Sequence, residues 1–134
     1  MKLKAPTGLE IRMTKDKGWG VFATEFIAKG SIIEECYVLT IPHTCLAFES
    51  TLFKDYRFNW PQGDEAIEQT LPLGFGCVYN HSDYNNAYWV NHPTYDRVFQ
   101  FIAQRDIYPD EEVCTWYGTD AYWKSDGRQN VVVK

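Results

Sequence analysis

The sequence lacks the residue patterns of a structural metal site. Its four cysteines, Cys36, Cys45, Cys77 and Cys114, are scattered, and neither a Cys-x-x-Cys pair nor a His-x-x-x-His pair occurs. This pattern argues against a zinc cluster and is typical of free, buried thiols in a reducing compartment. We therefore expect no metal ion.

Two further absences concern location and partners. No secretion signal and no apolar run of membrane-spanning length occurs, so we expect a soluble, intracellular protein, cytoplasmic or nuclear, without membrane contact. The 13 Lys and Arg form no basic stripe and are outnumbered by 18 Asp and Glu, giving a net charge of −5. This balance disfavours direct nucleic-acid binding and favours a basic protein or peptide partner. Mild acidity is also ordinary for a cytosolic protein.

Aromatic residues, by contrast, are abundant. The 134 residues are 45% hydrophobic and 16% aromatic, which is enough for one domain with its own core. The nine Tyr, eight Phe and five Trp exceed what a small core needs, so some should line a groove or pocket. We expect one domain over residues 1–123 and a largely polar tail over residues 124–134.

Short alternating, β-branched or aromatic segments separated by turn signals predict a mostly-β fold. The strands are expected at residues 9–13, 18–23, 31–41, 71–79, 87–91, 97–103 and 113–117. Residues 44–60 fit either a short helix or a turn before a strand, and residues 61–65 fit a surface loop. No internal repeat is evident in the sequence.

The stretch from Leu71 to Ala87, LPLGFGCVYNHSDYNNA, ends an apolar run in Asn80-His81-Ser82. An apolar strand that stops at three polar residues delivers hydrogen-bonding groups to a fixed place, as a binding site requires. Taken alone, the stretch is better explained as a strand followed by a polar turn. Other motifs must therefore decide its meaning.

Three motifs occur together: Gly18-Trp19-Gly20-Val21-Phe22-Ala23, then Asn80-His81-Ser82 with Asn86-Ala87, then Asp110-Glu111-Glu112 leading to Trp116-Tyr117-Gly118. In this order, with Gly30-x-x-Ile33-x-Glu35 between the first two, they resemble the SET domain, the family of S-adenosylmethionine-dependent protein-lysine methyltransferases. The resemblance covers about residues 11–123 and looks closest to the compact viral and bacterial members. It implies the SET (β-clip) fold of short strands and small sheets, with a C-terminal pseudoknot in which the last strand passes beneath a loop.

The resemblance implies S-adenosylmethionine as the cofactor. The residues implied to hold it are Lys17, Gly18, Trp19, Gly20, Asn80, His81, Tyr117 and Trp123. Glycines in a turn let the backbone approach a ligand, and an Asn amide carries both donors and an acceptor. An ordinary tight hairpin explains the two glycines about equally well. Trp123 lies six residues after Tyr117, slightly further along the chain than the compact members lead us to expect. His81 is expected to bind without transferring a proton.

Tyr117 is implied as the catalytic residue, and the residues implied to contact the substrate are Cys36, Tyr37, Thr115 and Trp116. Methyl transfer from a sulfonium needs a neutral lysine amine, and burial together with a neighbouring positive charge lowers the pKa of that amine. The protein then mainly positions the reactants. Without the Asn80-His81-Ser82 motif, a core aromatic would be the better interpretation of Tyr117.

The substrate peptide is expected to lie extended in a groove, like an added strand. The candidate walls of this groove are Tyr37, Phe58, Trp60 and Tyr84.

The sequence departs from the family pattern at three positions. Cys36 replaces a frequent Tyr, which removes a hydroxyl from the lysine channel unless Tyr37 supplies it, and Asn85 replaces a usual Pro. Thr115 stands where Phe or Tyr is common, and its small side chain predicts room for di- or trimethylation. The Cys-rich zinc segment that follows many SET domains is absent after Trp123.

The preferred hypothesis is a lysine methyltransferase acting on a basic protein such as a histone tail. A ribosomal or other basic protein is also open as substrate, and so is a homodimer, since some compact members dimerise. The alternative is a catalytically weak module that keeps the fold and binds a basic peptide, for which the Cys36 departure is the only support. A third hypothesis, an interaction protein of unrelated β fold, predicts no affinity for the cofactor.

Overall fold

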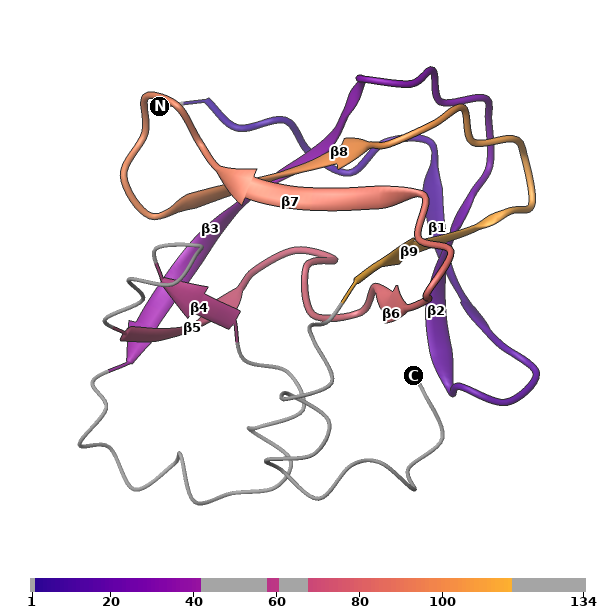
Figure 1. The fold of residues 1–134 in the computed structure, drawn as a ribbon, viewed down its shortest axis with the longest axis horizontal. Helices are drawn as coiled ribbons and strands as arrows, with labels where there is room; N and C mark the ends of the chain where they lie inside the picture. Colours follow the sequence, from indigo (N-terminus) through magenta and orange to yellow (C-terminus); the bar gives the residue numbers. More distant parts are fainter. Residues whose placement is uncertain (1, 42–57, 61–67, 117–134) are drawn as a thin grey trace. The chain divides into compact units, whose positions relative to one another are not determined.

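A computed structural model describes residues 2–41, 58–60 and 68–116 of the chain (Figure 1). These residues form nine strands and no helix, which confirms the predicted mostly-β fold. The strands are β1 (Leu9–Met13), β2 (Trp19–Ala23), β3 (Ile32–Ile41), β4 (Phe58–Trp60), β5 (Glu68–Pro72), β6 (Asn80–His81), β7 (Ala87–Asn91), β8 (Val98–Ala103) and β9 (Glu112–Thr115). No helix capable of crossing a membrane occurs among the described residues.

The chain divides into two compact units, each built from three separate segments. Unit 1 comprises Met1–Thr7, Ile32–Cys77 and Trp89–Phe101. Unit 2 comprises Gly8–Ser31, Val78–Tyr88 and Ile102–Lys134. Strands β7 and β8 carry the chain from one unit to the other.

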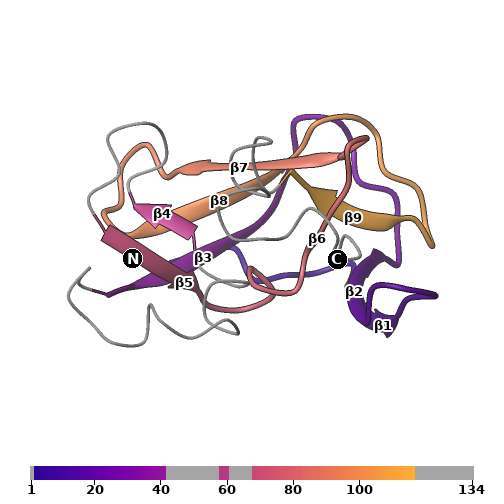
Figure 2. The ribbon, with the colours of Figure 1, turned by 60° about the horizontal axis from the view of Figure 1, so that its bottom comes forward.

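Unit 1 contains most of a five-stranded sheet with the order β4-β5-β3-β8-β7, seen from a second side in Figure 2. The sheet packs an aromatic cluster, because Phe58 lies within 5.0 to 6.2 Å of Trp89, Phe99 and Phe101, measured between ring centroids. Phe99 and Phe101 are fully buried. Aromatic pairs at such distances stabilise a core beyond the area that they bury.

The N-terminal segment is attached to β3 of unit 1 through Glu35. The Glu35 carboxylate accepts hydrogen bonds of 2.9 Å from the Lys4 backbone N–H and from Gln100 Nε2, and its Oε2 lies 3.0 Å from His92 Nε2. Burial alone would raise the pKa of Glu35, but these hydrogen bonds and the nearby His92 outweigh it and lower the pKa. The carboxylate is thereby held in its ionised form.

Unit 2 contains a four-stranded sheet with the order β1-β2-β9-β6. Strand β2 pairs antiparallel with β1 and with β9, whereas β6 pairs with β9 in parallel, Asn80 beside Cys114 and His81 beside Thr115. Residues far apart in sequence are thus neighbours in one small sheet. Its core is made of small and β-branched side chains that are almost completely buried: Val21, Ala23, Ala103, Ile107 and Val113.

Unit 2 also contains a structural repeat that the sequence does not display. Residues 23–31 and 103–111 follow the same course, and Ile27 and Ile107 donate to each other's carbonyl oxygens at 2.8 Å. Ala23 N–H donates to Glu111 O, and Ala103 N–H donates to Ser31 O, both at 2.9 Å. The two segments thus share a backbone course, although no internal repeat is evident in the sequence.

The strand predicted over residues 71–79 was wrong in its position. Strand β5 ends at Pro72, and residues 73–78 form turns. Gly74 has φ of +74°, and a Cβ there would lie 2.8 Å from Glu34 Oε2, so this glycine is required for the turn. Alternation of large and small residues here reflects successive turns packed on β3, where Phe75 N–H donates to Glu34 Oε2 at 3.4 Å.

The remaining strands agree with the prediction within two residues at their ends. The strand predicted at 113–117 is described as Glu112–Thr115. Of the ambiguous stretch 44–60, residues 58–60 are strand β4, while residues 44–57 and the loop predicted at 61–65 lie outside the described residues. The predicted tail over 124–134 lies outside them as well.

Candidate functional site

The turn between β1 and β2 positions the first group of predicted site residues. Thr14 closes it, because its backbone N–H and its hydroxyl both donate to Gly18 O at 2.7 Å, and its Oγ1 accepts from Lys17 N–H at 2.8 Å. Gly18 has φ of +72°. Lys17 and the half-exposed Trp19 are therefore presented from a well-ordered turn.

Gly20 is needed because other side chains occupy the space beside it. A Cβ at this position would lie 2.5 Å from Glu112 Oε2 and 2.9 Å from both Asn80 Nδ2 and Thr14 Cγ2. Real Cβ atoms do not approach other atoms so closely. The second glycine of the motif thus serves the close approach of β2 to the groups on β6 and β9.

Asn80 connects the three motifs. Its side chain is buried, and its Nδ2 donates to Trp19 O at 3.1 Å and to Glu112 Oε2 at 2.7 Å. A primary amide has two N–H donors and one acceptor oxygen. Both donors are used within unit 2, which leaves Oδ1 as the acceptor.

His81 lies next to Asn80 and is buried. Its Nε2 lies 3.0 Å from Oδ1 of the exposed Asp83, and its backbone oxygen lies 3.4 Å from Lys17 Nζ. The histidine ring is thus oriented by a carboxylate, while its main chain faces the Lys17 ammonium. The structure brings together Lys17, Gly18, Trp19, Gly20, Asn80 and His81 as predicted neighbours.

Two residues important to this arrangement were not among the predicted site residues. The Glu112 side chain accepts from Asn80, and its backbone oxygen accepts from Asn86 Nδ2 at 2.8 Å. Asn86 Oδ1 in turn accepts from Cys114 N–H at 2.8 Å. The sequence placed Glu112 and Asn86 in the motifs, but nothing in it showed that the Glu112 side chain joins β9 to β6, or that the Asn86 side chain joins β9 to the segment after β6.

Thr115 is buried at the end of β9. Its relative exposure is 1%, and its Oγ1 is a buried polar atom without a hydrogen-bond partner among the residues that the structure describes. Buried hydroxyls are nearly always hydrogen-bonded, so one without a partner asks for an explanation. Trp116 follows it and is about half exposed.

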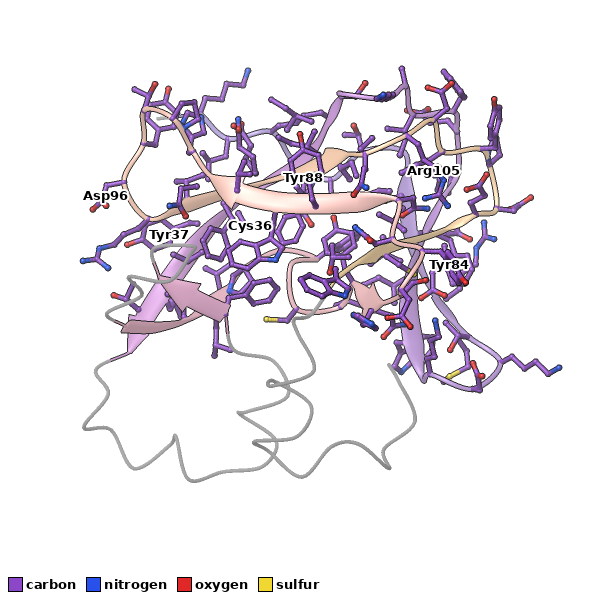
Figure 3. The ribbon with its side chains drawn as sticks, viewed as in Figure 1. Cys36, Tyr37, Tyr84, Tyr88, Asp96 and Arg105 are labelled. Atoms are coloured by element: carbon purple, nitrogen blue, oxygen red, sulfur yellow. The ribbon has the colours of Figure 1, made fainter. Side chains whose placement is uncertain are left out.

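The other two residues predicted to contact substrate, Cys36 and Tyr37, lie on β3 in unit 1. Cys36 is buried, and burial together with the neighbouring Glu34 raises the pKa of its thiol. Tyr37 is exposed, and its backbone oxygen accepts from Leu73 N–H at 2.9 Å. Figure 3 labels both residues. Neither cysteine chemistry nor ionisation is expected at Cys36.

The candidate walls of the groove differ in their surroundings. Phe58 belongs to the aromatic core of unit 1, whereas Tyr84, labelled in Figure 3, is 87% exposed in unit 2. The backbone at Tyr84 is held by Arg105, whose Nη1 donates to Tyr84 O at 3.3 Å and to Asn85 O at 3.0 Å. The side chain of Trp60, and Tyr117 and Trp123 as a whole, lie outside the described residues.

Nucleophilic or metal chemistry has little support in the described part of the chain. Burial and the charge of Glu112 raise the pKa of Cys114 to about 12, and burial raises that of Cys77 to about 11. Both thiols therefore remain protonated at neutral pH. Among the described residues, no group of three or more His, Cys, Asp or Glu could hold a metal ion.

Comparison with known proteins places these features in context. The SET domain profile matches residues 18–118 of the chain. The chain is 34% identical over 122 residues to the histone-lysine N-methyltransferase of Schizosaccharomyces pombe that is specific for H3 lysine-37, covering 88% of this chain and 78% of that protein.

Two further proteins are similar. The H3 lysine-36-specific histone-lysine N-methyltransferase of Saccharomyces cerevisiae is 31% identical over 123 residues, which are 85% of this chain and 16% of that longer protein. A crystal structure of a Plasmodium falciparum protein assigned as a histone methyltransferase superposes with a TM-score of 0.69 at 31% identity, covering 90% of this chain and 97% of that one.

Proposed function

Because the chain belongs to the SET-domain family of protein-lysine methyltransferases, we propose that it uses S-adenosylmethionine to methylate a lysine in a histone or a similarly basic protein. The observation that carries the proposal is the pair of bonds from Asn80 Nδ2 to Trp19 O and Glu112 Oε2. This one amide joins three motifs that are up to 93 residues apart, counted from Trp19 to Glu112, into a single site.

The donors and acceptors of the site fit the amino-acid end of this cofactor. Lys17 offers a cation for a carboxylate, while Asn80 Oδ1 offers an acceptor for an ammonium group, since both Asn80 N–H groups are already engaged. The half-exposed Trp19 offers aromatic surface beside them. When bound, the cofactor would supply an electrophilic methyl group on a sulfonium.

The chemical task left to the protein is positioning. A free lysine with pKa about 10.4 costs roughly 4–5 kcal/mol to deprotonate near pH 7. A narrow, partly apolar channel lowers this cost by disfavouring the ammonium. The proposed role of Tyr117 is to orient the amine with its hydroxyl, and Trp123 is proposed to pack on the adenine ring.

The substrate channel is proposed to include Thr115. Its buried hydroxyl, which has no partner in the described part of the chain, supports this assignment, because a polar substrate group or a water entering the channel would satisfy it. Its small side chain leaves room for added methyl groups, so we expect di- or trimethylated product. Thr115→Tyr should restrict the product to monomethyl-lysine, and Thr115→Val, of similar size, should keep multiple methylation, as read by mass spectrometry of the product.

Histones are proposed as substrates because both curated relatives are histone-lysine methyltransferases. A net charge of −5 also favours a basic partner. Cys36, Tyr37 and Trp116 are proposed to contact the substrate, as the family resemblance implies.

The proposal is tested by transfer of a labelled methyl group from S-adenosylmethionine to core histones, histone-tail peptides and ribosomal proteins. We expect lysine labelling by the wild type, its loss in Tyr117→Phe, and at least tenfold weaker cofactor binding by Lys17→Ala in calorimetry. Lys15→Ala is the matched control, since Lys15 is an exposed lysine of the same turn. Cofactor binding without any labelling would favour the weakly catalytic peptide-binding module, and no cofactor binding would overturn the assignment.

A further inference from the structure

Two aromatic rings are exposed beside each other on the repeated turns of unit 2, residues 23–31 and 103–111. The antiparallel bridge between Ile27 and Ile107 places Phe26 opposite Tyr108. These two side chains are 51% and 55% exposed, and their ring centroids lie 5.3 Å apart at an interplanar angle of 52°. Single exposed apolar side chains are normal in soluble proteins, whereas adjacent exposed rings offer a surface that another molecule can contact.

Carboxylates border the two rings. Glu25 directly precedes Phe26, and Glu111 follows Tyr108 by three residues. The backbone holds the two turns together here, because Ala23 N–H donates to Glu111 O at 2.9 Å and Glu111 N–H donates to Tyr108 O at 3.1 Å. In the part of the chain that the structure describes, the carboxylates of Glu25 and Glu111 have no hydrogen-bond or ion-pair partner.

The two basic residues of these turns lie away from the rings. Arg105, labelled in Figure 3, donates from its Nη1 to the backbone oxygens of Tyr84 and Asn85 at 3.3 and 3.0 Å. Lys29 lies on the other side of the isoleucine bridge, where its backbone N–H donates to Asp106 Oδ1 at 2.8 Å. The charge that borders the rings is therefore negative.

An arginine of this chain already lies in such surroundings next to the turns. The guanidinium carbon of Arg12 lies 5.2 Å from the centroid of the Phe22 ring. The same guanidinium pairs with Glu10 and, at 2.9 Å, with Asp110 of the second turn. Arginine suits this combination because its planar group stacks on an aromatic face while its N–H fork matches a carboxylate. The rings and carboxylates of the turns offer the same combination a second time.

We propose a docking surface for an arginine-bearing segment of a partner protein, made of Phe26, Tyr108, Glu25 and Glu111. A guanidinium lies over a ring and donates to a carboxylate, as Arg12 does within the chain. The two rings are in contact with each other, so the arginine covers an outer ring face and does not enter between them. The net charge of −5 attracts a basic segment to this surface.

The test uses a short Gly-Ser peptide that carries three arginines, and a copy in which neutral citrulline of nearly the same shape replaces each arginine. In amide NMR titrations we expect saturable shifts at residues 24–29 and 106–111, and none at residues 17–20 or 80–81. The citrulline peptide should bind at least tenfold more weakly. Binding of the arginine peptide should also weaken in 1 M NaCl, because salt screens exposed charges.

Variants then separate the rings from the rest of the surface. Phe26→Ser and Tyr108→Ser should each weaken binding of the arginine peptide by about fivefold, whereas Tyr108→Phe keeps the ring face and should bind like the wild type. Tyr88→Ser is the matched control, since Tyr88 is a 40% exposed tyrosine of unit 2 outside the docking surface (Figure 3). Because both rings are more than half exposed, the variants should keep the urea midpoint of the wild type.

Docking and the proposed methyl transfer are tested separately. The docking surface follows the last residue of β2, whereas Asn80 binds the first, Trp19. The titration contains no cofactor, so a protein that fails to methylate can still bind the peptide, and the reverse. A wild type without shifts at millimolar peptide, equal binding of the citrulline copy, an equal loss in Tyr88→Ser, or shifts confined to residues 17–20 and 80–81 would each overturn the proposal.

Discussion

The two repeated turns of unit 2, residues 23–31 and 103–111, reach the same backbone course with different residues. Only the first residue, Ala23 or Ala103, and the central isoleucine, Ile27 or Ile107, are identical between them. Each turn ends in a left-handed residue, Gly30 with φ of +85° in the first and Asp110 with φ of +72° in the second. Their hydrogen bonds match as well, since Gly30 N–H donates to Ala103 O and Asp110 N–H to Ala23 O, both at 2.8 Å.

The difference between the turns shows which features the conformation requires. A small residue at the start is kept because Ala23 and Ala103 are both buried in the core, and an isoleucine is kept at the centre, where Ile107 is buried and Ile27 half-buried. The left-handed position accepts Gly or Asp, because these residues visit that region most readily. In the second turn Asp110 also pairs with Arg12. The shared course thus depends on packing and on one backbone conformation.

The largest expected effect comes from the two isoleucines. Ile107 is fully buried whereas Ile27 is half-buried, so Ile107→Ala should lower the free energy of unfolding by about 2–5 kcal/mol and Ile27→Ala by clearly less. Urea unfolding followed by Trp fluorescence measures both. Equal losses would show that the turns are energetically equivalent despite their different burial.

The left-handed positions provide the next test. Gly30→Ala should cost about 1–2 kcal/mol, because a Cβ is disfavoured at positive φ even where space is open. Gly30→Asp copies the second turn and should cost less than Gly30→Ala in the same urea titration. If the aspartate variant is the less stable one, the tolerance seen at Asp110 depends on its surroundings and not on residue type.

One hydrogen bond between the two turns has no counterpart in the opposite direction. Lys29 N–H donates to Asp106 Oδ1 at 2.8 Å, whereas the equivalent of Lys29 in the second turn is Pro109, which has no N–H. Asp106→Ala should therefore cost about 0.5–1.5 kcal/mol. Asp106→Asn, which keeps an acceptor, is the control, and its free energy of unfolding should stay close to that of the wild type. An equal loss of stability in both variants would show that the charge of Asp106 matters rather than the hydrogen bond.

The smallest effect is expected at the Arg12–Asp110 pair. Asp110→Asn keeps a residue that tolerates left-handed φ and removes only the exposed charge. The unfolding midpoint should change by little more than its error at low salt, and the difference should vanish in 1 M NaCl. A large loss that persists in salt would mean that the aspartate itself holds the turn.

Much of the fold could be predicted from local patterns. The strands near residues 9–13, 19–23 and 98–103 could be predicted because each is a short alternating, β-branched or aromatic segment bounded by turn residues. Their burial does not simply alternate, because β8 is buried on both faces and β1 has no buried residue. The strand predicted over residues 71–79 failed because alternating Leu, Gly and Phe residues there follow turns with Gly74 at positive φ. The repeat at residues 23–31 and 103–111 could not be found, because two shared residues in nine carry too little signal.

The candidate site could be predicted as a set of motifs but not as a set of contacts. The residue type and order of Gly18, Gly20, Asn80 and His81 indicated the family. The role of Glu112 depends on where its side chain lies after β9 has inserted between β2 and β6, and no local pattern encodes that position. Likewise, the sequence could not show that Thr115 Oγ1 is buried without a hydrogen-bond partner among the described residues.

The central place of β9 between β2 and β6 has a consequence for biosynthesis. Trp19 and Asn80 are synthesised first, and Glu112, whose carboxylate accepts the second hydrogen bond from Asn80 Nδ2, lies 32 residues after Asn80. On the ribosome, where the chain emerges from its N-terminus, β2 and β6 must wait without their shared neighbour. The three motifs therefore cannot be joined before Glu112 has been synthesised, and a chain arrested before Glu112 carries the first two motifs without the strand that lies between them.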